Sequence, residues 1–322
     1  CSMSAHPTLQ VRVALKRAET QDICSLELVA LDGAALPVFT AGAHIDVHLP
    51  NGQIRQYSLT NAEGHVTQAR YQIAVARDVH SRGGSDWIHD KLRTGAALGV
   101  SEPCNLFTLD AKANRKVLFI GAGIGITPIY AMVQSAQTSR MDWHLMACAR
   151  SASRMAFQEE LMALDPARVR FHFDQEQGGP LDLNALLTSA PWDAVYACGP
   201  AGLLDAIDAA TVDWPVGSVR MERFKAQAQD NSGNTEFELV LSQRGQSVWV
   251  GANESPLEAL ERMGIDHPFS CREGLCGTCE VQLVEGQPHH RDNVLDADEI
   301  AAGQRFIPCV SRCGGDRLVI NL

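Results

Sequence analysis

The stretch CREGLCGTC, residues Cys271–Cys279, lies near the end of the chain, and Cys309 follows thirty positions after it. Three cysteines spaced C-x4-C-x2-C with a distant fourth form the plant-type pattern for a two-iron, two-sulfur cluster held by four thiolates. The small residues Gly274, Gly277 and Thr278 suit a loop that folds tightly and directs backbone N–H groups toward the cluster sulfurs. The sequence therefore predicts Cys271, Cys276, Cys279 and Cys309 as metal ligands.

Two other uses of these cysteines are a structural zinc site and a disulfide knot. Structural zinc sites usually combine two CxxC or HxxxH pairs, whereas here the lone Cys309 closes the site. Ten cysteines in 322 residues do not make a disulfide-dense scaffold, and cluster thiolates require a reducing compartment. The pattern favours the cluster over zinc.

The composition is that of an ordinary globular chain, with 45% hydrophobic and 20% charged residues and a formal net charge of −11. A chain of this length has room for two or three domains. The acidic balance argues against nucleic acid as a partner, because phosphate binding needs a basic surface. The chain has no apolar run of about 18 residues and no signal pattern at its start, so we expect a cytoplasmic location without membrane contact.

Residues 6–110 carry short apolar or alternating runs separated by Gly, Pro and Asn, which predicts an antiparallel β-sheet or β-barrel. The predicted strands are Leu9–Leu15, Ile23–Val29, His44–Leu49, Arg55–Thr60 and Arg70–Ala76. Alternation along the fourth strand sends Arg55 and Tyr57 to one face and Ser58 to the other. Alone, that segment reads as an ordinary barrel strand.

The loop Gly83-Gly84-Ser85 precedes a predicted short helix, Asp86–Leu92. Two glycines let backbone N–H groups approach an anion closely, Ser85 adds a hydroxyl, and a helix N-terminus favours phosphate. The alternative is a plain connecting loop.

Residues 112–226 begin with the apolar strand Lys116–Ile120, which runs directly into Gly121-x-Gly123-x-Gly125, followed by Thr127, Pro128 and a helical segment. Strand, glycine turn and helix form a nucleotide-binding unit, although the spacing is not the usual GxGxxG. Further predicted strands are Trp143–Ala149, Val169–Phe173 and Asp193–Cys198, and the predicted helices between and after them are Met155–Leu164 and Ala201–Ala209. This alternation predicts an α/β domain with a parallel sheet, with Cys198 and Gly199 at the strand end where such sheets bind ligands.

Residues 227–234 are small and polar and predict a linker. Residues 235–322 then show two strands, Glu236–Leu241 and Ser247–Val250, and a helix that begins at Ser255-Pro256 with Glu258 completing a capping box. With the cysteine loop they predict an α+β domain. From Asn234 onward there are fourteen Asp and Glu against seven Arg and no Lys, so this domain carries much of the acidity.

In their order, the motifs of residues 6–110 resemble the flavin domain of ferredoxin-NADP reductase-like enzymes. The resemblance implies that Arg55 and Ser58 hold the flavin, that Tyr57 packs on its ring, and that Gly83, Gly84 and Ser85 bind its phosphate. It further implies a catalytic role for Ser58, as a donor to the reactive flavin nitrogen.

The second domain is similar to the nucleotide domain of the same enzymes. The resemblance implies that the segment Gly121–Pro128 binds the pyrophosphate through Gly121, Gly123, Gly125, Thr127 and Pro128, and that Arg150 and Ser151 lie near the adenine ribose. Cys198 and Gly199 would lie beside the nicotinamide, and Cys198 would position it for hydride transfer. A buried Cys is otherwise a small apolar residue, and Phe224 is either a cover for the flavin or a core residue.

Together, the three modules resemble the phthalate dioxygenase reductase group, the reductase components of Rieske-type oxygenases, and the last module resembles a plant-type ferredoxin of the β-grasp fold. This implies an NADH-dependent oxidoreductase with FMN rather than FAD, since the group with a C-terminal ferredoxin uses FMN. Electrons would pass from NADH through flavin and the 2Fe-2S cluster to a separate terminal oxygenase, either an aromatic-ring dioxygenase or a demethylating monooxygenase. Two alternatives remain: a different acceptor, such as a heme monooxygenase, or an electron carrier that does not oxidise NADH.

Overall fold

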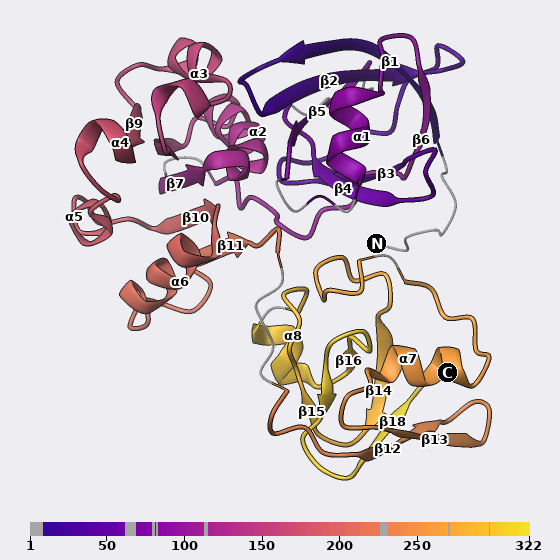
Figure 1. Ribbon diagram of the computed structural model, residues 1–322. Helices are drawn as coiled ribbons and strands as arrows, with labels where there is room; N and C mark the ends of the chain where they lie inside the picture. Colours follow the sequence, from indigo (N-terminus) through magenta and orange to yellow (C-terminus); the bar gives the residue numbers. More distant parts are fainter. Residues whose placement is uncertain are drawn as a thin grey trace. The chain divides into compact units, whose positions relative to one another are not determined.

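The computed structural model describes residues 9–61, 69–78, 81, 83–112, 115–225, 231–269, 271–295 and 297–322. The chain divides into two compact units (Figure 1), the first ending at Arg223 and the second beginning at Phe224. Each unit has its own hydrophobic core. The first unit contains two sheets and the second a larger mixed sheet with a small two-stranded one.

The first sheet of the first unit is a six-stranded antiparallel barrel with the strand order β4-β3-β6-β1-β2-β5. Its strands are β1 Leu9–Ala18, β2 Ile23–Ala30, β3 His44–His48, β4 Ile54–Ser58, β5 Tyr71–Ala76 and β6 Ala97–Val100. A bridge from Leu59, directly after β4, to Ile73 of β5 joins the two edges of the sheet. Inward-facing residues such as Val11, Leu28 and Ile45 are fully buried, as period-two alternation around a closed sheet requires.

Helix α1, Gly84–Asp90, lies beside β5 (Figure 1). It begins two residues earlier than the sequence indicates, because Gly83 adopts φ +97° and caps the helix in the left-handed region that glycine reaches without strain. At its other end the ammonium of Lys16 donates to the carbonyls of Ile88 and His89, both at 2.7 Å. A cation there satisfies carbonyls that a helix C-terminus leaves unpaired.

The second sheet is five-stranded and wholly parallel, with the order β11-β10-β7-β8-β9. Its strands are β7 Lys116–Ala122, β8 Asp142–Ala149, β9 Val169–Phe173, β10 Ala194–Cys198 and β11 Val219–Glu222. The chain order reverses on either side of β7, which makes its carboxyl end the switch point where open α/β sheets bind ligands.

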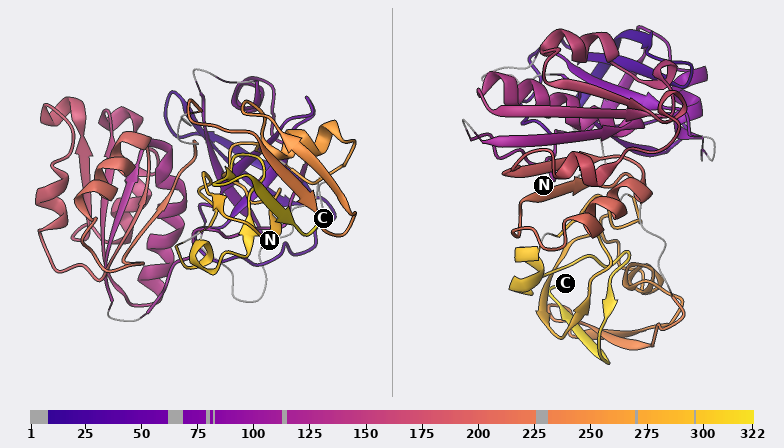
Figure 2. Two further views of the ribbon diagram at one scale, coloured as in Figure 1. Left: turned by 90° about the horizontal axis from the view of Figure 1, so that it is seen from below. Right: turned by 90° about the vertical axis from the view of Figure 1, so that its left-hand side faces the viewer.

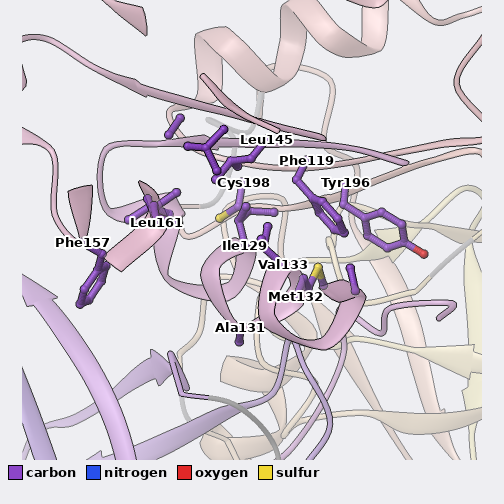
Figure 3. Packing of buried hydrophobic residues seen from close by; sticks show 14 of the residues in the cluster. Phe119, Ile129, Ala131, Met132, Val133, Leu145, Phe157, Leu161, Tyr196 and Cys198 are labelled. Atoms are coloured by element: carbon purple, nitrogen blue, oxygen red, sulfur yellow. The ribbon is translucent and has the colours of Figure 1, made fainter. Parts of the chain in front are cut away.

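Helices cover both faces of this sheet (Figure 2). They are α2 Ile126–Thr138, α3 Gln158–Leu164, α4 Asp174–Gln177, α5 Leu183–Leu187 and α6 Ala201–Ala210, with short 3-10 turns η1 Gly123–Gly125 and η2 Ala152–Arg154. Figure 3 shows Ile129 and Met132 of α2 packed with Phe119 of β7 on one face. On the other face, Leu118 and Ile120 pack with residues of α5 and α6. Burial on both faces explains the continuous apolar run of β7.

The predicted helix Met155–Leu164 is wrong in its first turn, since α3 begins only at Gln158. Met155 is extended, and Phe157 takes φ +61°. Both side chains are buried, and the ring of Phe157 stacks on Tyr130 of α2 with centroids 5.1 Å apart. Burial of two large apolar side chains, about 1.5–3 kcal/mol each, outweighs the loss of one helical turn.

The second unit is a mixed five-stranded sheet of the order β13-β12-β18-β14-β16 with one helix packed on it, together with a short β15–β17 pair. Its elements are β12 Phe237–Leu241, β13 Gln246–Val250, α7 Pro256–Arg262, β14 Val281–Glu285, β15 Pro288–His289, α8 Ala297–Ala302, β16 Arg305–Phe306, β17 Arg312–Cys313 and β18 Arg317–Ile320. Strands β12 and β18 run parallel although they come from opposite ends of the unit. The predicted fold class, with its barrel, parallel-sheet and α+β ferredoxin-like modules, is confirmed.

The capping box at α7 is also confirmed: Ser255 Oγ accepts from the N–H of Glu258 at 3.2 Å, and the Glu258 carboxylate accepts from the N–H of Ser255 at 2.8 Å. Of the predicted linker, residues 227–230 lie outside the described residues. Asn231 and Asn234 both bond the guanidinium of Arg291, and so they attach to the second unit. Within the described part of the chain, no helix is long and apolar enough to cross a membrane.

Candidate functional site

The four cysteines of the second unit lie in two pairs. Cys271 is within hydrogen-bonding distance of Cys276, and Cys279 is within hydrogen-bonding distance of Cys309. All are free thiols, and only Cys271 is partly exposed. Among the described residues, no three His, Cys, Asp or Glu side chains gather closely enough to hold one metal ion. A two-iron cluster takes two protein ligands on each iron, so two thiol pairs fit that group better than they fit a single zinc ion.

The backbone of the loop is arranged around these sulfurs. The N–H groups of Glu273 and Leu275 donate to Cys271 Sγ at 3.3 and 3.4 Å, and the Thr278 hydroxyl donates to Cys276 Sγ at 3.1 Å. Gly274 has φ +68°, and a Cβ on it would lie 2.5 Å from a methyl group of Val310. Donors aimed at sulfur stabilise thiolate and tune a cluster.

The carboxylate of Asp292 stabilises the segment that packs against the cysteine loop. The side chain of Asp292 is wholly buried, and it accepts from the Ser311 hydroxyl at 2.9 Å and from the N–H of Leu295 at 3.0 Å. The next residue, Asn293, donates its N–H to the carbonyl of Gly274 at 2.9 Å. These contacts tie the segment before α8 to the cysteine loop.

In the first unit, Arg55 and the Gly83-Gly84 turn lie against each other. A Cβ on Gly84 would stand 2.8 Å from Arg55 Nε, so only glycine allows the guanidinium this close to the first turn of α1. The Ser85 hydroxyl accepts from the N–H of Asp78 and donates to Ser81, both at 3.1 Å. A cation, the backbone of a glycine turn and two hydroxyls form a cradle whose chemistry fits a phosphate group.

Tyr57 and Ser58 lie at the end of β4, on the same barrel strand as Arg55. Tyr57 is half-buried, and this burial raises the pKa of its phenol, which therefore stays neutral. Ser58 is buried and pairs with His44 of β3. Two residues further on, the carbonyl of Thr60 accepts from the Gln134 side chain of α2 at 2.8 Å, which joins the barrel to the parallel-sheet domain.

The glycine turn after β7 packs on the end of β10. A Cβ on Gly125 would lie 2.3 Å from the Cys198 carbonyl oxygen and 2.6 Å from Gly199 N. Gly121 pairs with Cys198 across the sheet, and Gly123 has φ +57° with open space around it. Thr127 and Pro128 are buried in the first turn of α2, and the Thr127 hydroxyl donates to the Ile124 carbonyl at 2.8 Å. The structure therefore brings the predicted nucleotide residues to the switch point.

Arg150 and Ser151 follow β8 at the same edge of the sheet. Arg150 is exposed and its carbonyl accepts from Gln175 N at 3.0 Å, while Ser151 Oγ lies 3.1 Å from Ser153 Oγ. Phe224 is 37% exposed and belongs to the second unit. Its predicted role as a flavin cover stays a prediction.

The second unit matches a family model described as a 2Fe-2S iron-sulfur cluster binding domain over residues 239–314, a range that includes all four paired cysteines. The chain is 52% identical to a toluene-4-sulfonate monooxygenase system reductase subunit of Comamonas testosteroni, in an alignment that covers 97% of this chain and 98% of that protein. The solved structure of a phthalate dioxygenase reductase is similar, with a TM-score of 0.69 and 38% identity over 98% of both chains.

The chain belongs to the phthalate dioxygenase reductase family. An intact type IV self-sufficient cytochrome P450 monooxygenase contains a similar arrangement, with a TM-score of 0.90 and 37% identity. The match covers 98% of this chain but 41% of the P450 chain. The family architecture therefore occurs both as a separate chain and as part of a longer one.

Sequence reasoning did not identify Glu222, the last residue of β11, as a candidate site residue. Glu222 pairs with Cys198 in the β10–β11 register, and its Oε2 is buried without a hydrogen-bond partner in the described part of the chain. Burial raises the pKa of this carboxyl to about 8. The pKa of the Cys198 thiol is also held well above its usual value, mainly by burial and to a smaller extent by the neighbouring Glu222. A buried polar atom with no partner is one that a bound ligand would satisfy.

Proposed function

We propose that this protein is the reductase component of a Rieske-type oxygenase system, which takes electrons from NADH through FMN and a 2Fe-2S cluster to a separate oxygenase. The observation that carries the proposal is the pairing of Cys271 with Cys276 and of Cys279 with Cys309, in a chain whose other unit holds a phosphate cradle and a nucleotide turn. The full-length similarity to a monooxygenase reductase subunit supports it.

The first unit would bind both the nicotinamide nucleotide and the flavin. Gly121, Gly123 and Gly125 form the glycine turn at the switch point, and the open space beside Gly123 lets a pyrophosphate approach the turn. Arg55 and the Gly83-Gly84-Ser85 turn bind the flavin phosphate.

Near the reacting atoms, Tyr57 is neutral and half-buried and provides a flat apolar surface for the flavin ring. Ser58 provides a hydroxyl to it, and Cys198 bounds the nicotinamide site with an uncharged thiol. A bound flavin would supply an acceptor for the single hydride of the nicotinamide, which carries two electrons, and would pass these electrons on one at a time to the one-electron cluster.

The proposed electron acceptor is a separate protein. Residues from Asn234 onward carry fourteen acidic side chains against seven Arg, and such a surface steers a basic docking site toward the cluster. We also propose a cytoplasmic location, since cluster thiolates need a reducing compartment.

A heme monooxygenase is the second candidate acceptor, because the P450 described above includes the same modules in one chain. Assays that combine the purified reductase with each type of oxygenase distinguish the two candidate acceptors. A Rieske oxygenase that turns over with this reductase and NADH, while a heme monooxygenase does not, supports the first, and the reverse result supports the second.

The test of the electron path uses Cys276→Ser, with Cys313→Ser as a matched control because Cys313 is a free, half-buried thiol outside the two pairs. We expect Cys276→Ser to keep NADH-dependent ferricyanide reduction, which needs only the first unit, and to lose cytochrome c reduction. Cys313→Ser should keep both activities. Full cytochrome c reduction by Cys276→Ser would place the exit point at the flavin and contradict the proposal. Chromatography of acid-released flavin should show FMN, and FAD would correct the cofactor.

A further inference from the structure

Arg154 forms an ion pair with a carboxylate from the barrel. Its Nη1 lies 3.1 Å from Asp22 Oδ2. Arg154 ends the η2 turn, directly after β8 of the nucleotide domain, whereas Asp22 lies in the turn between β1 and β2. The pair therefore joins the flavin barrel to the loop that follows the second strand of the parallel sheet.

The loop after β8, which contains Arg154, lies where the adenosine half of a nucleotide would bind. In doubly wound sheets the end of the strand beside the glycine-turn strand lies near the adenosine ribose, and an Arg there accommodates the 2′-phosphate of NADPH. β8 is that strand, since it pairs with β7. Two arginines follow it, Arg150 and Arg154, with Ser151 and Ser153 between them. The loop thus contains the cations for a phosphate clamp.

Asp22 is held in place independently of Arg154. Its Oδ1 accepts from the Thr20 hydroxyl at 2.9 Å, and its carbonyl accepts from Arg77 N at 2.7 Å. The side chains of Asp22 and Arg154 are 34% and 49% exposed, so water and a ligand phosphate both reach the pair. A fixed carboxylate in that position competes with a phosphate for Arg154 and adds like-charge repulsion.

We propose that Asp22 is a specificity-determining residue that disfavours NADPH by engaging Arg154, which would otherwise bind the 2′-phosphate. The inference rests on the proposed function, because it assumes that this edge binds the adenosine half of a nicotinamide nucleotide. It places a determinant of nucleotide choice in the flavin barrel, outside the nucleotide domain.

A purely structural role for the pair is the rival explanation. The same β1–β2 hairpin makes a second ion pair with the nucleotide domain, between Arg17 Nη2 and Glu160 Oε1 at 2.7 Å. Glu160→Gln weakens that contact and leaves Arg154 untouched, so it serves as the matched control. Asp22→Asn keeps the shape and the Thr20 contact while removing the charge.

The experiment titrates the full-length protein, loaded with its flavin, with ADP-ribose and with 2′-phospho-ADP-ribose by calorimetry. We expect Asp22→Asn to improve the affinity for 2′-phospho-ADP-ribose relative to ADP-ribose by about fivefold, the scale of one partly exposed charge pair. Adding Arg154→Ala to Asp22→Asn should cancel the gain, and Glu160→Gln should not produce it. The ratio of kcat/KM for NADPH to that for NADH should change in the same direction.

An unchanged affinity ratio in Asp22→Asn would overturn the inference while leaving the proposed function intact. An equal gain in Glu160→Gln would also overturn it, because loosening of the two domains would then be the cause. If the unmodified protein bound neither ligand and did not oxidise NADH, the proposed function would fail first and the inference with it.

Discussion

Gly125 packs so closely on Cys198 that a Cβ at position 125 would lie 2.3 Å from the Cys198 carbonyl oxygen. The contact sets the distance between the glycine turn and the end of β10, the two segments that meet at the switch point of the sheet. It also explains why the turn needs its third glycine although the GxGxG spacing differs from the usual fingerprint. The backbone of Cys198 and Gly199, more than the turn's own conformation, imposes this requirement.

Gly125→Ala should therefore displace the Cys198-Gly199 backbone and weaken nucleotide binding. We expect the Kd for ADP-ribose to rise at least about tenfold, or about 1.4 kcal/mol. Gly202→Ala is the control, because Gly202 lies in α6 with nothing within 4 Å of an added Cβ. Calorimetric titration of both variants checks the prediction, and unchanged affinity in Gly125→Ala would show that the close approach is dispensable.

Gly84→Ala should reduce flavin binding. The added Cβ would meet Arg55 Nε at 2.8 Å and its Cγ at 3.0 Å, so the guanidinium must leave the phosphate cradle. We expect the Kd for FMN to rise about tenfold, in line with losing one charge-assisted contact. Fluorescence titration of the flavin-stripped protein measures it. Gly315→Ala, where an added Cβ meets nothing within 4 Å, should bind FMN like the unmodified protein.

The strands that the sequence predicts well are those whose pattern is local. Val169–Phe173 matches β9, and the apolar run of β7 is visible because both faces are buried. The short strands β15, β16 and β17 have two residues each and carry no period that a sequence reading can detect. They form because distant segments pair, as Pro288 does with Cys313. At Phe157 the sequence predicts a helical turn that does not form, because the stacking of its ring on Tyr130 overrides the local helical pattern.

The same distinction holds for the candidate site. The cysteine and glycine motifs can be recognised in the sequence because their residues are closely spaced along the chain. The cluster loop and the nucleotide turn could therefore be predicted. Glu222 and Asp22 are single acidic residues without a motif. Their surroundings depend on the β10–β11 register and on the approach of the barrel to η2, which only the folded chain shows.

His267 lies outside the cysteine motif but bonds one of its members. Its Nε2 is 3.0 Å from the carbonyl oxygen of Cys279, and the side chain is buried. His267→Leu leaves that carbonyl without its donor, which costs about 1–3 kcal/mol, whereas His267→Gln can still donate. We expect less iron per chain and faster bleaching by a chelator in His267→Leu, with His267→Gln close to the unmodified protein. Equal bleaching rates in all three proteins would assign His267 a packing role alone.

Glu222 predicts a pH dependence of stability with a defined sign. Burial raises the pKa of its carboxyl from the ordinary 4.5 to about 8 in the folded protein. Between these values the folded state holds a proton that the unfolded state has lost, so stability falls as pH rises. Glu222→Gln cannot ionise and escapes this loss. We therefore expect the Tm of Glu222→Gln to exceed that of the unmodified protein increasingly from about pH 5 to about pH 8.

Thermal unfolding at several pH values across that window, in low-salt buffer, measures the difference between the two proteins. Glu236→Gln is the control, because Glu236 is exposed and removing an exposed carboxyl should shift Tm by a small amount that does not depend on pH. A constant Tm difference between Glu222→Gln and the unmodified protein would mean that the Glu222 carboxylate is solvated in the folded state. A difference that widens with pH would show that the chain keeps a buried acid beside Cys198 at a cost in stability, as functional sites often do.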